Sequence, residues 1–406
     1  MRQEKSYRQI RNFVDTLPIF STHEHHQQDE FFTDLSLDKI LLNSYVAWCN
    51  VPFGDTEKSR AEYLAKVRLN SYFVWLEKSL RELYHVDGKI TAQSWDELSN
   101  RISTAHAGPG FHLDILRNRC RYEAVVQDSY WDPGSDLGHP DLFKPNFRIN
   151  MLLFGYHEEA MDHNGNNPLQ WYKLKPGSLD DYTEWIRWKI RQQKEAGCVA
   201  LKSALAYDRM IRYEKVSRAD AGRAFGRHPD ELRTEEKLAF GDYIFHTICD
   251  AAEELDLPFQ QHAGLGIIRG SNPMNLEPVI ARYPRIRFVL FHGGYPWFHE
   301  VGGLAHNYAN VYLDLCWLPL ISTTAAVSAL HEYIEVAQTS DRITWGGDNW
   351  TSEESYGAVL AFKYVTSLVL SQKVESGYFD TEDARVFAEG LFYRNARALY
   401  GGGAFL

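Results

Sequence analysis

The segment Ile19–His26 reads Ile-Phe-Ser-Thr-His-Glu-His-His, an apolar run that ends in histidines. Side chains of a β-strand alternate between its two faces, so a strand ending at His25 presents His23 and His25 on the same face. His26 then points to the opposite face. Because two imidazoles fixed on one face of a strand are suited to holding a divalent metal ion, the segment predicts a metal site at the end of a first strand.

Seven further apolar, β-rich runs follow along the chain, separated by helical or loop sequence. With the first strand at 17–25, the expected strands lie at 121–127, 147–154, 198–205, 257–262, 285–292, 311–317 and 342–348. Continuous apolar strands that alternate with helices indicate a parallel sheet covered on both faces. Eight such units favour a (β/α)8 TIM barrel over an open sheet.

The sequence between about 27 and 116 has a different, helical character. Apolar residues at spacings of three and four between Glu62 and Val86 predict amphipathic helices there. The 406 residues of the chain exceed the roughly 250 typical of such a barrel. We therefore expect one domain spanning 1–406, with a helical insertion at about 27–116.

The amino-acid composition limits the kinds of partner that the chain is expected to bind. The net charge is −11 and no block of Lys or Arg occurs, so we expect no nucleic-acid or membrane partner. No apolar run approaches the length of a membrane span, and the first residues lack an apolar signal segment. The five cysteines are scattered, which is typical of free thiols in a reducing compartment. We expect a cytoplasmic homo-oligomer that acts on a small molecule.

Four later side chains could complete the metal site, because the carboxyl ends of all barrel strands converge on one face. They end strands four, five, six and eight, and are Lys202, His262, His292 and Asp348. Taken singly, a strand-end His or Lys is commonly structural, and an Asp after Gly-Gly commonly caps a turn or helix. The agreement of chain order and end position favours a site. The predicted metal ligands are His23, His25, His262 and Asp348.

This combination resembles the amidohydrolase superfamily, with HxH on strand one, Lys on strand four, His on strands five and six, and Asp on strand eight. The similarity is greatest to the branch that includes the amidohydrolase-like part of some glutamine synthetase fusions. The segments that carry it are LKSALAY (201–207), QQHAGLG (260–266), FHGGYP (291–296), NVYLD (310–314) and RNARALYG (394–401). The helical insertion resembles that of uronate isomerases, a more distant branch. The resemblance specifies a superfamily and no particular substrate.

The expected cofactor is a divalent metal, with Zn²⁺ favoured and one ion per chain. Two-metal members of the superfamily bridge their ions with a carboxylated lysine on strand four, which gives Lys202 an alternative role. Uncarboxylated, Lys202 would instead bind a substrate carboxylate. Asp348 is the expected catalytic proton acceptor, and His292 the residue that orients water or stabilises an oxyanion.

Residues that follow strand ends are expected to line the pocket. The candidates for substrate binding are Tyr207, Arg209, Trp317 and Trp350. The forked guanidinium of Arg209 matches a substrate carboxylate, although a structural role is an equal alternative for it.

Three functions compete on this reading. The leading hypothesis is a metal-dependent hydrolase that cleaves an amide or other C–N bond, or a lactone, of a small polar or carboxylate-bearing substrate. The alternative is a uronate-isomerase-like isomerase or a decarboxylase on the same metal site. A non-catalytic metal-binding barrel is the third.

Overall fold

Eight parallel strands form the centre of the computed structural model, which describes residues 2–401. They pair in chain order from β1 to β8, as a TIM barrel requires, so the predicted fold is confirmed. The strands are β1 (Ile19–Glu24), β2 (Tyr122–Gln127), β3 (Phe143–Arg148), β4 (Ala200–Ser203), β5 (Phe259–Gln261), β6 (Phe288–Leu290), β7 (Val311–Asp314) and β8 (Ile343–Thr344).

Backbone hydrogen bonds between β1 and the segment after β8 close the barrel. The amide of Thr22 donates to the carbonyl of Trp345 at 3.1 Å, and the amide of Asp348 donates to the carbonyl of His23 at 2.8 Å. The second bond matters for function, because it ties the expected ligands of strands one and eight together through their backbones.

Helices cover the outside of the barrel. Those that follow strands β3 to β8 in turn are α7 (Pro168–Trp171), α8 (Leu179–Glu195), α9 (Arg218–Gly222), α10 (Thr234–Glu254), α11 (Glu277–Arg282), α12 (Phe298–Asn307), α13 (Leu318–Ile321), α14 (Thr323–Val336) and α15 (Ser352–Glu375). The helix α1 (Arg2–Val14) precedes the barrel, and α16 (Thr381–Glu389) and α17 (Asn395–Tyr400) follow it.

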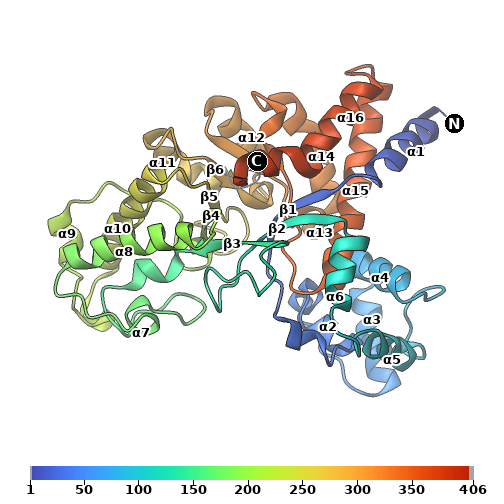
Figure 1. Cartoon of the computed structure of the whole chain (residues 1–406), viewed down its shortest axis with the longest axis horizontal. Coiled ribbons are helices and arrows are strands. Elements are labelled where there is room, and N and C mark those ends of the chain that lie inside the picture. The colour runs from blue at the N-terminus through green and yellow to red at the C-terminus, as the bar shows by residue number, and fades with distance from the viewer. Residues whose placement is uncertain (1, 402–406) are drawn as a thin grey trace.

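The helical insertion forms a cluster of its own beside the barrel (Figure 1). Its helices are α2 (Leu37–Leu42), α3 (Glu57–Val67), α4 (Ser71–Leu83), α5 (Trp95–Ala105) and α6 (Phe111–Asp114). They bury a separate hydrophobic core that includes Phe73, Leu80 and Trp95. Because α4 packs along α15, the insertion is held against the barrel close to the end of β8.

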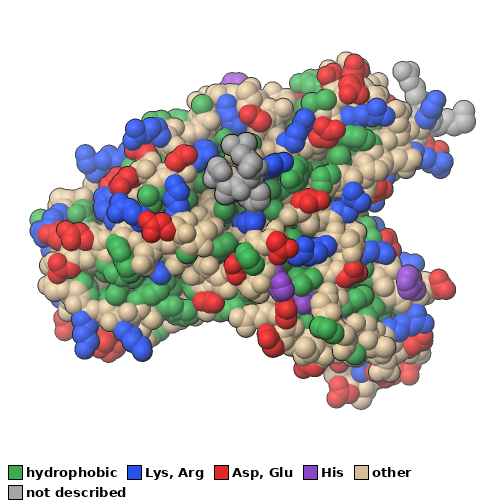
Figure 2. Space-filling view, viewed as in Figure 1, with side chains coloured by type: hydrophobic (Ala, Val, Ile, Leu, Met, Phe, Trp, Pro, Cys, Tyr) green, Lys and Arg blue, Asp and Glu red, His purple; other side chains and the backbone are tan. Residues whose placement is uncertain are grey.

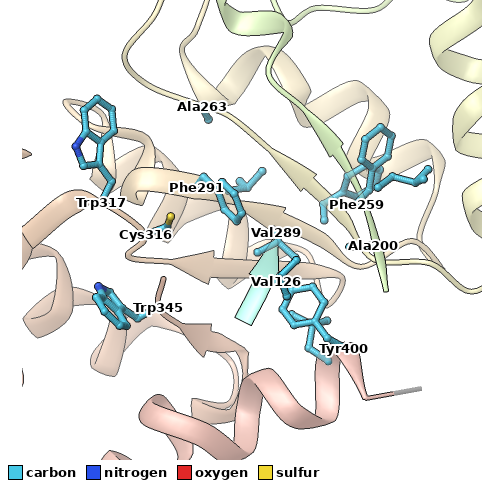
Figure 3. Close-up of a cluster of buried hydrophobic side chains, with 14 of the residues drawn as sticks. Val126, Ala200, Phe259, Ala263, Val289, Phe291, Cys316, Trp317, Trp345 and Tyr400 are labelled. Atoms are coloured by element: carbon cyan, nitrogen blue, oxygen red, sulfur yellow. The ribbon is translucent and has the colours of Figure 1, made fainter. Parts of the chain in front are cut away.

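Buried hydrophobic side chains pack against the strands of the barrel, as Figure 3 shows for Val126, Phe259, Val289 and Phe291. At the amino-terminal end of the strands, Tyr400 of α17 closes the interior: its hydroxyl oxygen accepts a hydrogen bond from Gln260 Nε2 at 3.0 Å. Within residues 2–401, the pocket open to a substrate is therefore at the carboxyl end of the strands.

The third strand lies earlier than the sequence indicated. It spans Phe143–Arg148, and most of the expected strand 147–154 instead forms a 3₁₀ turn over Asn150–Phe154. This apolar turn is buried, and Tyr182 of α8 donates a hydrogen bond to the Leu152 carbonyl at 2.6 Å. The apolar run thus reflects packing of a turn beneath a helix rather than a continuing strand. Arg148 is therefore the last residue of β3.

Basic and acidic side chains are interspersed over the face drawn in Figure 2. Within residues 2–401, none of the helices has the length and apolar character needed to cross a bilayer. All five cysteines are free thiols.

Candidate metal centre

His23 and His25 lie at the end of β1, and their imidazoles reach the same pocket. His25 Nδ1 is 2.8 Å from the backbone carbonyl of Asp128. A carbonyl can only accept, so this nitrogen carries the hydrogen and the lone pair of His25 is on Nε2. Nε2 in turn lies 3.1 Å from Asp348 Oδ1. A backbone contact of this kind fixes the tautomer that a metal ligand needs.

Asp348 is brought to the histidines by a strained turn. Its φ is +69°, a left-handed conformation that non-glycine residues rarely adopt and that clusters at functional sites. The turn passes close to β1: a Cβ at Gly346 would lie 2.6 Å from the backbone nitrogen of His23. His292 and Trp317, which follow β6 and β7, also have positive φ. The chain therefore turns sharply at three neighbouring strand ends.

The His23 ring is completely buried, and neither of its nitrogens has a hydrogen-bond partner within residues 2–401. Its Nε2 lies 3.4 Å from Asp348 Oδ1 and 3.6 Å from Asp128 Oδ2. Potential ligand atoms of His23, His25 and Asp348 all lie within 4.8 Å of one another. Burying a polar atom without a hydrogen-bond partner costs free energy. An ion bound by these three groups would give a His23 nitrogen the partner that it lacks. The residues present fit a divalent metal.

The other two predicted histidines lie side by side but differently from the first pair. His262 lines the pocket, with Nδ1 2.9 Å from His292 Nε2 and Nε2 2.8 Å from the Leu265 carbonyl. His262 does not join the His23–His25–Asp348 group. His292 is fully buried behind His262 and does not line the pocket, so it contacts a substrate only through His262 or Asp348. A second group unites His292, Asp348 and the buried thiol of Cys316.

Burial and charge set the protonation states that metal binding requires. Burial, together with the Lys202 ammonium, holds the pKa values of His23 and His262 well below their usual range, so both rings are neutral. Burial would raise the pKa of Asp348, but the adjacent His25 imidazole and the Lys202 ammonium lower it to about 2. Burial lowers the pKa of Lys202 to about 8. Neutral imidazoles and an ionised carboxylate are the ligand forms.

The pocket has a volume of about 390 Å³ and aromatic walls. Tyr130, Tyr207 and Trp350 come from loops after barrel strands, and Trp350 stacks on His25. Tyr45 and Trp48 come from the helical insertion. The insertion is therefore part of the site, and Tyr45 donates a hydrogen bond to Asp348 Oδ2 at 2.7 Å.

Of the four residues expected to bind substrate, two line the pocket and two do not. Tyr207 and Trp350 line the pocket. Trp317 lies one layer behind, stacked on Tyr45 with ring centroids 4.3 Å apart. Arg209 is not part of the pocket: its guanidinium forms a 2.6 Å ion pair with the buried Asp242. The expected carboxylate-binding role of Arg209 is thus replaced by a structural one, because its guanidinium is already bound to Asp242 and to backbone carbonyls.

Sequence reasoning missed a buried ion pair at the pocket. Arg148 ends β3, lines the pocket and forms a 2.7 Å contact with Asp128 Oδ2. The single Arg in the apolar run 147–154 indicated a functional residue. With the strand expected to continue to 154, Arg148 did not stand at a strand end and was not considered for the site. Lys202 also lines the pocket, with its ammonium 3.8 Å from the centroid of the Phe291 ring.

Comparison with known proteins identifies the family to which the chain belongs. Residues 133–402, more than half of the chain, match the amidohydrolase family. Protein fluG of Emericella nidulans is 36% identical over 149 residues, which are 35% of this chain and only 17% of fluG.

Two solved structures share the fold along nearly the whole chain. The uronate isomerase of Thermotoga maritima has a TM-score of 0.79 at 18% identity, covering 98% of this chain and 97% of its own. A protein of Lactobacillus casei, provisionally described as a metal-dependent hydrolase, has a TM-score of 0.69 at 19% identity, covering 96% of each chain. At these identities the likeness shows the fold, including the insertion. The family match shows more: this chain belongs to the amidohydrolase family of metal-dependent enzymes.

Proposed function

We propose that this enzyme hydrolyses an amide or other C–N bond, or a lactone, of a small polar or carboxylate-bearing molecule. The observation that carries the proposal is the buried, unpartnered His23 imidazole beside His25 and an ionised Asp348. The group opens onto an aromatic-walled pocket of about 390 Å³, which limits the substrate to a small molecule.

His23, His25 and Asp348 would hold the metal, and His262 is the fourth predicted ligand. A bound divalent ion supplies Lewis acidity and lowers the pKa of water towards neutrality. We propose Zn²⁺, because imidazole nitrogens and a carboxylate oxygen are among its preferred donors. Neither the pocket nor the ligand geometry requires a second ion, so one ion per chain is proposed.

The protein side chains have separate roles in this scheme. Asp348 Oδ2 accepts the proton of the attacking water and returns it to the leaving amine, and the Tyr45 hydroxyl holds that oxygen in place. The Lys202 ammonium lies in the same pocket and would pair with a substrate carboxylate. The aromatic walls exclude water and pack against the apolar part of the substrate.

A second candidate is the isomerisation of a uronic acid. The whole-chain structural likeness to the uronate isomerase of Thermotoga maritima, insertion included, favours it. Such a reaction would use the same ligands, with a protein base that moves a proton between adjacent carbons. A cytoplasmic location and assembly into a homo-oligomer complete the proposal.

The test is a substrate panel given to the purified, zinc-loaded protein. It contains primary amides, N-acyl amino acids, lactams and lactones, each with and without a terminal carboxylate, and a parallel set of uronic acids. Amine or acid release is expected, and Asp348→Asn should lower turnover by about 10²–10⁴-fold because the proton acceptor is lost. Asp341→Asn, at an exposed position before β8, is the matched control with unchanged turnover. Ketose formation from uronic acids without any hydrolysis would replace the first candidate by the second.

A further inference from the structure

A histidine–aspartate pair faces the pocket from the loops after β3 and β4, outside the metal group. His163 lines the pocket, and its Nδ1 lies 2.9 Å from Asp208 Oδ2. The backbone amide of His163 also donates to Asp208 Oδ1 at 2.6 Å. The Asp208 side chain is only 3% exposed, so the carboxylate is buried beneath the imidazole.

The contacts of Asp208 determine which nitrogen of His163 carries the hydrogen. Besides the His163 amide, Asn150 Nδ2 donates to Asp208 Oδ2 at 2.9 Å. Both neighbours are donors, and an ionised carboxylate can only accept. His163 Nδ1 is therefore the protonated nitrogen, and the lone pair of the ring is on Nε2. Within residues 2–401, Nε2 has no hydrogen-bond partner; the side chain is 25% exposed, and the residue lines the pocket.

The loop that carries His163 is fixed by its own polar side chains. Asp162 Oδ1 accepts hydrogen bonds from the amides of Asn164 and Asn166 at 2.9 and 3.0 Å. Asn167 Nδ2 donates to the carbonyl of His157 at 2.9 Å. A loop held in this way presents the imidazole in one orientation before any ligand arrives, which reduces the ordering cost of binding.

Tyr207 lies against both this pair and His262, the fourth predicted metal ligand. Its ring centroid lies 4.6 Å from that of His262 and 5.1 Å from that of His163. Because the metal group, Tyr207 and His163 line the same pocket, one bound molecule can reach all of them.

We infer that His163, oriented by Asp208, is a substrate-binding residue that accepts a hydrogen bond from an O–H or N–H group on the substrate. The group is at the end of the substrate away from the metal ligands. A buried carboxylate that binds one nitrogen of an imidazole makes the other nitrogen a stronger hydrogen-bond acceptor. A catalytic base and the residue that orients it form the same kind of pair. The inference defines a substrate class: molecules that carry a hydroxyl, amine or amide donor at the remote end. Its link to turnover rests on the proposed function.

A purely structural role for His163 makes a different prediction. If the ring served only to hold Asp208, Asn at position 163 would suffice, because its Nδ2 can replace Nδ1–H while nothing replaces Nε2. His163→Asn thus keeps the contact with Asp208 and removes the acceptor. His157→Asn is the matched control, since His157 lies in the same loop and does not line the pocket.

The first experiment needs no substrate. Nitrogen NMR of the full-length, zinc-loaded protein with ¹⁵N-labelled histidine reports the tautomer, and the signal missing from His163→Asn identifies His163. The expected result is Nδ1–H with an unprotonated Nε2, shifting towards Nε2–H in Asp208→Asn. An Nε2–H tautomer in the wild type would overturn the inference, whatever reaction the enzyme catalyses.

The second experiment compares substrates of the panel that differ only in a remote hydroxyl or its methyl ether. The wild type should favour the hydroxyl compound by about tenfold in kcat/KM, the worth of one hydrogen bond. This preference should vanish in His163→Asn and persist in His157→Asn. A preference that is absent, or that survives in His163→Asn, contradicts the inference.

If the wild type turns over no member of the panel, the proposed hydrolysis fails and the inference is decided by binding. The probes are then 4-hydroxybutyrate and 4-methoxybutyrate, titrated while the His163 Nε2 resonance is followed. A change with the hydroxy acid alone supports the inference, and equal or absent changes with both acids reject it.

Discussion

Removing one hydroxyl from the helical insertion should weaken the metal centre in the barrel. Tyr45 donates a 2.7 Å hydrogen bond to Asp348 Oδ2, and burial and the nearby carboxylates raise the pKa of Tyr45, so the hydroxyl stays neutral and donating. A hydrogen bond to a charged group contributes about 1.5–3 kcal/mol. At about 1.4 kcal/mol per factor of ten, Tyr45→Phe should weaken metal binding by about 10–100-fold, the range for partners of metal ligands.

The measurement is the metal dissociation constant by competition with a chromophoric chelator. Phe preserves the stack on Trp317, so the fold should survive. Tyr72→Phe is the control, because Tyr72 stacks against Tyr45 and Trp317 without a hydrogen bond to Asp348. Metal affinity of Tyr45→Phe within threefold of the Tyr72→Phe value would refute the reasoning that the insertion positions Asp348.

Other predictions concern charge. Lys202→Ala should keep one equivalent of metal but raise KM for carboxylate-bearing substrates; two equivalents in the wild type that fall to one or none would show a bridging role instead. Arg209→Met should cost about 3–5 kcal/mol in urea unfolding, because it leaves Asp242 buried without its partner, and should not alter substrate preference. Burial raises the pKa of Glu354 to about 8, so the folded state binds a proton that the unfolded state releases near pH 4.5. Its contribution to stability is full at acid pH and is lost as the pH rises towards 8, and Glu354→Gln should flatten that decline in urea unfolding; an unchanged slope would contradict the assignment.

The fold could be predicted from the sequence because local pattern and global topology agree in it. Apolar strands alternate with helices, and His23, His25, Lys202, His262 and Asp348 each stand where a strand ends. Strand three was misplaced because apolarity reports burial and not conformation: the turn after Arg148 is as buried as the strand before it.

The pocket walls could not be predicted in the same way, because they depend on contacts between distant segments. Nothing local indicates that Tyr45 reaches Asp348, 303 residues away. Arg209 was expected to bind a substrate because Arg suits carboxylates, but the carboxylate it binds is Asp242 of the same chain. The sequence likewise does not indicate the positive φ angles of His292 and Asp348, because the packing of neighbouring strand ends imposes them.

The metal centre itself is tested most directly by elemental analysis of purified protein. The wild type should hold about one divalent ion per chain, and His23→Ala/His25→Ala should hold almost none while remaining folded by circular dichroism. The double variant His299→Ala/His306→Ala, on α12 and away from the pocket, should retain the full equivalent. Stoichiometric metal in His23→Ala/His25→Ala would contradict the assignment of these two histidines as ligands.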